Sequence, residues 1–128
     1  MANGKPAPQR GVARVHILAN DSHIVGFYTL TSTNLDNSDN GIKGYPRHIP
    51  AILIGRMGID LRYQGQELSK TLLWNALTKI KAISQDTGVM VATIDLKNDS
   101  LANYYTQYGF KPLQNANRLI MSVEHLPS

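Results

Sequence analysis

A long amphipathic helix is the sequence feature that most limits the possible folds. Apolar side chains recur at helical spacing between Gln66 and Gln85, and Gly88 follows as a stop signal. This spacing predicts a helix that packs one face against a core. The apolar stripe consists of Leu68, Leu72, Leu73, Ala76, Leu77, Ile80 and Ile83.

Strands are predicted before this helix. Alternating side chains indicate strands over Val12–Leu18 and His23–Ser32, with turn-forming residues between them, so the two form a β-hairpin. Residues 33–48 are polar and rich in Asn, Asp and Gly, which indicates an exposed loop. Pro50 then opens a third strand, Ala51–Asp60, whose apolar residues on both faces are typical of a central strand.

Shorter elements are predicted after the helix. Val89–Leu96 reads as a strand, Asp99–Tyr108 as a short helix that ends at Gly109, and Leu119–Val123 as a last strand. The predicted order is therefore β-β-β-α-β-α-β, a mixed α/β fold. A chain of 128 residues with 42% hydrophobic residues fits a single domain over residues 1–128, with residues 1–11 as an irregular lead-in.

Composition excludes several classes of chemistry. The chain has no cysteine, which rules out thiol catalysis, disulfides and zinc–cysteine sites, and its four histidines lack metal-ligand spacing, so we expect no metal. No apolar run is long enough to span a bilayer, so we expect a cytoplasmic protein that does not enter membranes. The net charge of +4 favours anionic partners and leaves open both nucleic acid and an ordinary solvated surface.

The junction between the third strand and the long helix is a candidate phosphate site. A glycine-containing turn runs from Asp60 to Lys70, with Gly65 inside it. Backbone N–H groups at a helix N-terminus lack intrahelical partners and can bind a pyrophosphate, to which Arg62 and Lys70 would add positive charge. A glycine at this place also serves as a plain turn residue, so the turn alone leaves both interpretations open.

A second cluster follows the next predicted strand. Leu101, Tyr105 and Tyr108 have the spacing of one helix face, which is compatible with a core tyrosine. In the functional interpretation Tyr105 is a proton donor, because a phenol with a pKa near 10 can protonate a departing thiolate.

Together, the two clusters resemble the acyl-CoA signature of the GNAT N-acetyltransferase superfamily. The first part of the signature reads Arg62-Tyr-Gln-Gly65-Gln-Glu67, and the second part reads Asn98, Tyr105 and Gly109-Phe110. Over about residues 8–125 the chain resembles more narrowly the GNAT toxins of bacterial toxin–antitoxin pairs. This narrower resemblance includes Val25-Gly-Phe-Tyr-Thr-Leu and Pro50-Ala-Ile-Leu-Ile-Gly-Arg-Met-Gly-Ile-Asp60.

The resemblance implies a GNAT fold with a sheet that opens beside the third strand. It implies acetyl transfer from acetyl-CoA to the α-amine of aminoacyl-tRNA, a homodimer and a ribbon-helix-helix antitoxin as partner. Tyr105 would be the general acid and Arg56 would lie on the acceptor side. The acetyl-CoA site would comprise Met57, Gly58, Ile59, Arg62, Tyr63, Gln64, Gly65, Gln66, Glu67, Leu68, Ser69, Lys70 and Asn98.

Two alternatives remain open at this point. One is an acetyltransferase for a protein N-terminus, a lysine or a small amine. The other is a binding module with a GNAT fold and weakened acetyl-CoA binding, because Glu67 places a carboxylate where the signature has glycine or alanine and Ser69 replaces a further glycine. A carboxylate in the first helical turn favours the helix dipole but repels a pyrophosphate.

Overall fold

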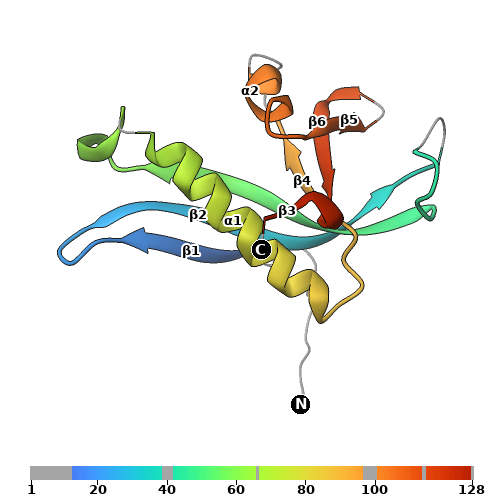
Figure 1. The fold of residues 1–128 in the computed structure, drawn as a ribbon, viewed down its shortest axis with the longest axis horizontal. Coiled ribbons are helices and arrows are strands. Elements are labelled where there is room, and N and C mark those ends of the chain that lie inside the picture. The colour runs from blue at the N-terminus through green and yellow to red at the C-terminus, as the bar shows by residue number, and fades with distance from the viewer. Residues whose placement is uncertain (1–12, 39–41, 66, 97–100, 114, 128) are drawn as a thin grey trace.

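The computed structural model describes residues 13–38, 42–65, 67–96, 101–113 and 115–127 (Figure 1). Six strands form one sheet in the order β1-β2-β3-β4-β6-β5. The strands are β1 (Ala13–Ala19), β2 (Ile24–Asp36), β3 (His48–Ile59), β4 (Val91–Asp95), β5 (Lys111–Leu113) and β6 (Asn115–Ser122). The helices are α1 (Leu68–Gln85) and α2 (Ala102–Thr106), with short 3-10 turns at η1 (Leu61–Tyr63) and η3 (Val123–His125).

The predicted hairpin of β1 and β2 is confirmed, and a side chain holds its turn. Asn20 Oδ1 accepts hydrogen bonds from the backbone N–H groups of Ser22 at 3.0 Å and His23 at 2.9 Å. The Asn20 N–H also donates to the His23 carbonyl at 3.0 Å. An Asx turn of this kind fixes the antiparallel register from Ala13 opposite Thr31 to Leu18 opposite Gly26.

The prediction of an exposed loop over residues 33–48 is wrong at both ends. β2 continues to Asp36 and β3 begins at His48, so Pro50 lies inside the strand, opposite Asn34, and does not open it. Polar residues fill the exposed positions of this extension, while Leu35 and Ile49 are buried in a second small core. The prediction failed because polar composition masked the alternation of the strand.

Helix α1 covers one face of β2 and β3 (Figure 1). The middle of its predicted apolar stripe, from Leu72 to Ile80, is buried and packs on core residues of the sheet such as Tyr28 and Ile54, while Leu68 and Ile83 are partly exposed. The helix begins at Leu68 and not at Gln66, which lies outside the described residues. In the part of the chain that the structure describes, no helix is long and apolar enough to cross a membrane.

The sheet opens in its middle, between β3 and β4. These parallel strands pair from Ala51 opposite Val91 to Ile54 opposite Ile94, and there their pairing ends. β3 continues to Ile59, whereas β4 stops at Asp95 and pairs on its other side with β6. Figure 1 shows β4, β6 and β5 diverging from β1, β2 and β3. This opening is the fold feature that positions the site.

The C-terminal part differs from the prediction in several details. β4 is shorter than the expected strand over Val89–Leu96. α2 spans only Ala102–Thr106, and residues 97–100, where the expected helix over Asp99–Tyr108 would start, lie outside the described residues. β5 was not predicted, and β6 extends from Asn115 to Ser122 instead of Leu119–Val123. Pro112 in β5 and the polar start of β6 gave no clear strand pattern, and the two strands stabilise each other by antiparallel pairing.

Candidate active site

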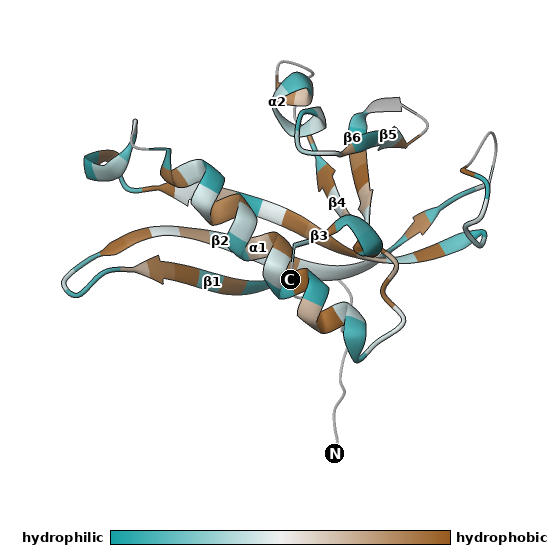
Figure 2. Ribbon diagram, in the orientation of Figure 1, coloured by the Kyte–Doolittle hydropathy of each residue, from teal (hydrophilic) through white to brown (hydrophobic). Residues whose placement is uncertain are grey.

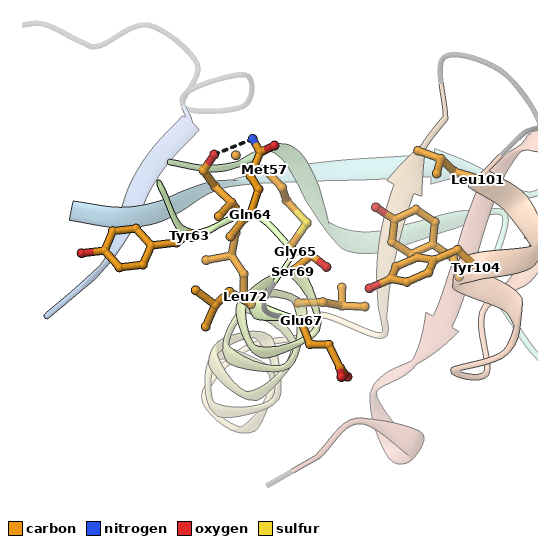
Figure 3. A pocket seen from close by; sticks show the side chains of 14 residues that line it. Met57, Tyr63, Gln64, Gly65, Glu67, Ser69, Leu72, Leu101 and Tyr104 are labelled. Carbon is orange, nitrogen blue, oxygen red and sulfur yellow. Dashed lines mark hydrogen bonds between the residues drawn. The ribbon is translucent and has the colours of Figure 1, made fainter. Parts of the chain in front are cut away.

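Two cavities meet at the opening of the sheet. The first has a volume of about 670 Å³ and lies between β3 and the start of α1, and the second has a volume of about 720 Å³. Met57, Leu101 and Tyr105 line both of them, so Tyr105 stands between the two spaces. The other lining residues of the first cavity are Gly58, Ile59, Tyr63, Gln64, Gly65, Glu67, Leu68, Ser69, Leu72, Leu73 and Tyr104 (Figure 3). The second cavity is also lined by Phe27, Ile54, Gly55, Arg56, Ile94, Asp95 and Leu96.

A bulge in β3 shapes the wall between the cavities. Tyr28 pairs with Met57 but Leu30 pairs with Ile54, so β3 carries one extra residue in this stretch. The Arg56 N–H donates to Thr29 Oγ1 at 2.9 Å across the bulge. The bulge leaves the Arg56 side chain exposed at the second cavity.

Gly55 and Gly58 let β3 lie close to Thr29 and Phe27 of β2 in this region. A Cβ atom on Gly55 would lie 2.5 Å from Thr29 Oγ1, and one on Gly58 would lie 2.6 Å from Phe27 Cε1. The phenyl ring of Phe27 therefore rests directly on the backbone of β3. These two glycines let β2 and β3 stay in contact through the bulge.

The turn after β3 is held by its own side chains. Asp60 accepts hydrogen bonds from the backbone N–H of Arg62 at 2.9 Å and from its guanidinium at 3.1 and 3.3 Å. These hydrogen bonds lower the pKa of the Asp60 carboxyl. Gln64 Nε2 donates to the Ile59 carbonyl at 3.0 Å, drawn as a dashed line in Figure 3. The charge of Arg62 is thus already engaged by Asp60 in this structure.

The start of α1 has an unusual backbone conformation. Gly65 has a φ of 83°, and nothing lies within 4 Å of the place where its Cβ would be. Glu67 precedes the helix with a φ of 60° in the left-handed region, and its side chain makes no capping hydrogen bond. Glu67 therefore lies outside the first helical turn, contrary to the expectation from sequence. Figure 3 shows its carboxylate pointing away from Met57 and Gln64.

Tyr105 is half-buried in a group of aromatic side chains. Its ring packs edge-on against Tyr104 at 5.1 Å and Phe110 at 6.0 Å between centroids. Burial, with a smaller contribution from Tyr104, raises the pKa of the Tyr105 hydroxyl. Within the described residues this hydroxyl has no hydrogen-bond partner, so it is available to a ligand.

Tyr108 links α1 to the region of α2. Its ring lies 5.9 Å edge-on from Trp74 and 5.4 Å from Tyr104, and Lys70 Nζ lies 5.9 Å from its centroid. These contacts connect the start of α1 with the residues around Tyr105. Trp74 itself is 41% exposed, so its contact with Tyr108 lies near the surface.

The structure brings most of the predicted site residues together. The first cavity collects those from Met57 to Ile59, from Tyr63 to Gly65 and from Glu67 to Ser69, and Arg56 lines the second. Arg62 and Lys70 flank the turn but line neither cavity. Gln66 and Asn98 lie outside the described residues.

Several lining residues were not predicted. Tyr104 and Leu101 are close in sequence to Tyr105, so proximity could have indicated them. Phe27 and Asp95 line the second cavity only because the bulge and the end of β4 bring them there, which no local pattern reveals. Among the described residues, no group of three His, Asp or Glu side chains could hold a metal ion.

Comparison with known proteins finds proteins of similar sequence. No family model matches the chain. It is 30% identical over 114 residues to a protein of Sinorhizobium fredii described as a "probable toxin TacT", covering 78% of this chain. It is 25% identical over 105 residues to a tRNA-acetylating toxin of Mycobacterium tuberculosis, covering 80% of this chain. The chain spans 63% of the length of each of these two relatives.

Solved structures show the same fold. AtaT complexed with acetyl-methionyl-tRNAfMet superposes with a TM-score of 0.78 at 25% identity, over 88% of this chain and 72% of that one. AtaTR bound with acetyl-CoA gives a TM-score of 0.75 at 25% identity, over 90% and 73%. An AtaT variant bound to the C-terminus of the antitoxin AtaR gives 0.74 at 25% identity, over 90% and 69%. The chain therefore has the GNAT N-acetyltransferase fold and is, by sequence and by structure, a relative of the GNAT toxins.

Proposed function

We propose that the protein is an N-acetyltransferase that moves the acetyl group of acetyl-CoA to the α-amine of an aminoacyl-tRNA. The observation that carries this proposal is the position of Tyr105, which lines two cavities on either side of the opening between β3 and β4. A direct transfer between two substrates needs such an arrangement, with one proton donor reached from both sides. The related tRNA-acetylating toxin and the AtaT complex support the choice of substrates.

The first cavity fits the acyl donor. Beyond Ile54, β3 has no neighbouring strand on its β4 side within the described chain, so backbone groups near Met57 and Gly58 can pair with the amides of a pantetheine arm. The start of α1 has no side-chain cap, and its N–H groups can bind a pyrophosphate. Gly65 leaves open space beside this turn. The other residues proposed to hold the donor are Ile59, Arg62, Tyr63, Gln64, Gln66, Glu67, Leu68, Ser69, Lys70 and Asn98.

The second cavity favours an acceptor whose amine is already neutral. Its ionisable lining residues, within the described chain, are Arg56, Asp95 and Tyr105. Asp95 is bound by both Nε and Nη2 of Arg118, the latter at 2.6 Å from Oδ2, so its carboxylate is engaged. An α-amine has a pKa of about 8 and a lysine amine about 10.4, so the α-amine needs far less help from a base near neutral pH.

In this acetyl transfer the protein has two tasks: it donates a proton and it stabilises negative charge. The neutral amine attacks the thioester carbonyl, the carbon–sulfur bond breaks, and the amine loses one proton to solvent. Tyr105 donates its hydroxyl proton to the departing sulfur and then regains a proton from solvent, and its raised pKa keeps the hydroxyl protonated at neutral pH before the reaction. A backbone N–H of β3 near the bulge would stabilise the carbonyl oxygen as negative charge develops on it.

The relatives also suggest partners and setting. Since AtaT was solved with the C-terminus of its antitoxin, we propose a small antitoxin of the ribbon-helix-helix type as a partner of this chain. We further propose that it acts as a homodimer in the cytoplasm, where aminoacyl-tRNA is found.

The proposal is tested by acetylation of a mixed aminoacyl-tRNA pool with labelled acetyl-CoA. N-acetyl amino acids released from the tRNA are the expected product, with little label on peptides carrying a free N-terminus or lysine, or on polyamines. Transfer mainly to those other amines would contradict the choice of acceptor. Absence of both acetyl transfer and acetyl-CoA binding would instead indicate a binding module.

The role of Tyr105 is tested by Tyr105→Phe. We expect kcat to fall by about 10²-fold or more while the dissociation constant for acetyl-CoA stays within about two-fold, because only a transition-state proton is lost. Tyr45→Phe is the matched control, since Tyr45 packs in the second small core and lines neither cavity at the opening. Equal kcat in the two variants would refute the assignment.

A further inference from the structure

The hairpin turn between β1 and β2 (residues 20–23) lies against the donor turn that follows β3 (residues 61–65). Asn20 Nδ2 donates a hydrogen bond of 3.1 Å to the Tyr63 hydroxyl, although the two residues are 43 positions apart in the chain. Nearby, the Asp60 N–H donates to the Val25 carbonyl at 2.8 Å. The hairpin turn is thereby joined to the donor turn, which lines the first cavity.

Both ends of the Asn20 amide group are used. Its Oδ1 atom holds the hairpin turn by accepting hydrogen bonds from the N–H groups of Ser22 and His23. Because the oxygen is fixed by these two backbone donors, the orientation of the amide is fixed as well, and its nitrogen is directed at Tyr63. Asn20 is therefore a bridge of defined geometry between the two turns.

Tyr63 is held both at its ring and at its hydroxyl. The guanidinium carbon of Arg62 lies 5.9 Å from the centroid of the Tyr63 ring, within the range of a cation–π contact. Figure 3 shows the Tyr63 side chain pointing away from Met57 and Gly65. The Tyr63 hydroxyl is thus directed to the hairpin turn, while the same residue borders the first cavity.

Apolar packing does little to hold the donor turn. None of the three residues of η1 is buried, and Leu61 is 83% exposed. Gly65 has a left-handed backbone with open space beside it. The hairpin turn is also exposed, and Figure 2 shows it as hydrophilic. Hydrogen bonds between the two turns therefore have a large share in fixing the position of the donor turn.

We propose that Asn20 is a positioning residue for acetyl-CoA, which acts through Tyr63 to hold the donor turn in the conformation that binds the pyrophosphate. This inference rests on the proposed function, in which the first cavity takes the acyl donor. Ordering a loose turn during binding costs affinity, so a turn that is held in place beforehand binds more tightly. Asn20 lines neither cavity, so donor binding depends on it and the chemical step does not.

Two substitutions remove the bridge from opposite ends. Tyr63→Phe deletes the hydroxyl and keeps the ring beside Arg62. Asn20→Ser keeps an oxygen that can accept hydrogen bonds in the hairpin turn, but serine is too short to reach Tyr63. Ser22→Ala is the matched control, because Ser22 joins the hairpin turn through its backbone N–H.

Acetyl-CoA binding and kinetics test the role of the bridge. We expect each single variant to raise the dissociation constant and the KM for acetyl-CoA by about three- to ten-fold, the effect of one exposed hydrogen bond. The kcat should stay within about two-fold, because the proton donor is untouched. The double variant Asn20→Ser/Tyr63→Phe should bind no more weakly than the weaker single variant, since both changes break the same hydrogen bond. Ser22→Ala should bind like the unchanged protein.

Hydrogen exchange tests the bridge without acetyl-CoA. Mass spectrometry of peptides that contain residues 61–65 should show about three- to ten-fold faster exchange of their backbone N–H groups in Asn20→Ser and in Tyr63→Phe. Ser22→Ala should show the exchange of the unchanged protein. A change that acts only on the hairpin turn would leave the exchange of residues 61–65 as it is.

The results separate this inference from the proposed function. Single variants that bind acetyl-CoA as tightly as the unchanged protein would overturn the inference and leave the proposed function standing. Losses that add in the double variant would show that Asn20 does not act through Tyr63. An unchanged protein that binds no acetyl-CoA would contradict the proposed donor site, and with it the effect of Asn20 on the donor.

Discussion

Glu67 lies two residues after Gly65, and both backbones are in the left-handed region, with φ of 60° and 83°. Glycine adopts this conformation without a steric penalty, whereas a residue with a Cβ atom pays about 1–2 kcal/mol. The signature that this turn resembles has glycine or alanine at the position of Glu67. The backbone therefore gives a physical reason for glycine there, independent of charge.

We predict that Glu67→Gly stabilises the protein. Removing the steric cost of the left-handed conformation should raise the free energy of unfolding by about 1 kcal/mol, partly offset by the greater freedom of glycine in the unfolded chain. The melting temperature should rise by about 4 °C, measured by calorimetry. A lower melting temperature would contradict the observed backbone conformation of Glu67.

Glu67→Gln separates the effect of the Glu67 charge from the effect of its left-handed backbone conformation. Glutamine keeps the side-chain shape and the backbone strain but removes the carboxylate from the edge of the first cavity. If charge repels the pyrophosphate, titration calorimetry should show tighter acetyl-CoA binding for both Glu67→Gln and Glu67→Gly. Since the carboxylate points away from Met57 and Gln64, we expect a gain of less than about ten-fold, and a larger gain would mean that it turns toward the cavity.

The raised pKa of Tyr105 predicts that its hydroxyl ionises at a higher pH than an ordinary tyrosine. The absorbance difference between the protein and Tyr105→Phe isolates ionisation of this hydroxyl, and its midpoint should lie above the ordinary value of about 10, because burial disfavours the phenolate. By linkage, the neutral hydroxyl contributes stability at pH values below about 10, and this contribution is lost as the pH rises further. A midpoint below 10 would require a nearby cation that the described structure does not contain.

Sequence patterns predicted the parts of the fold that depend on local periodicity. The stripe of α1, the hairpin of β1 and β2 and the central part of β3 were read correctly, because each repeats with the period of its own element. The end of β2 and the start of β3 were missed because their polar residues hide the alternation and their pairing with each other stabilises them. β5 was missed because it is short, contains Pro112 and is stabilised by pairing with β6.

The same distinction applies to the candidate site. The glycine turn and Tyr105 each belong to a local sequence pattern. The resemblance of both patterns to one family signature predicted that they lie in the same site. Phe27 and Asp95 come from separate strands, and the left-handed conformation of Glu67 depends on how the turn joins β3 to α1. Such features come from three-dimensional packing and register, which periodicity does not encode.

Gly58→Ala should disturb the wall between the two cavities. A Cβ atom there would lie 2.6 Å from Phe27 Cε1, so the ring has to move. We expect a loss of about 1–3 kcal/mol in the free energy of unfolding, measured by denaturant titration. Gly88→Ala is the matched control: nothing lies within 4 Å of its Cβ position, and we expect no loss of stability. Equal effects of the two substitutions would mean that Phe27 does not rest on β3 as described.

Arg56→Ala should affect the acceptor and leave the donor unchanged. The Arg56 side chain is exposed at the second cavity, and the Arg56 backbone N–H donates to Thr29 Oγ1. If Arg56 contacts a tRNA phosphate, Arg56→Ala should raise the KM for aminoacyl-tRNA. The slope of log affinity for tRNA against log salt concentration should fall in magnitude by about one, and acetyl-CoA binding should not change. Lys111→Ala removes an equal charge from β5, away from both cavities, and should leave the KM unchanged. If both variants weaken tRNA binding equally, the positive charge acts as a diffuse field and Arg56 makes no specific contact.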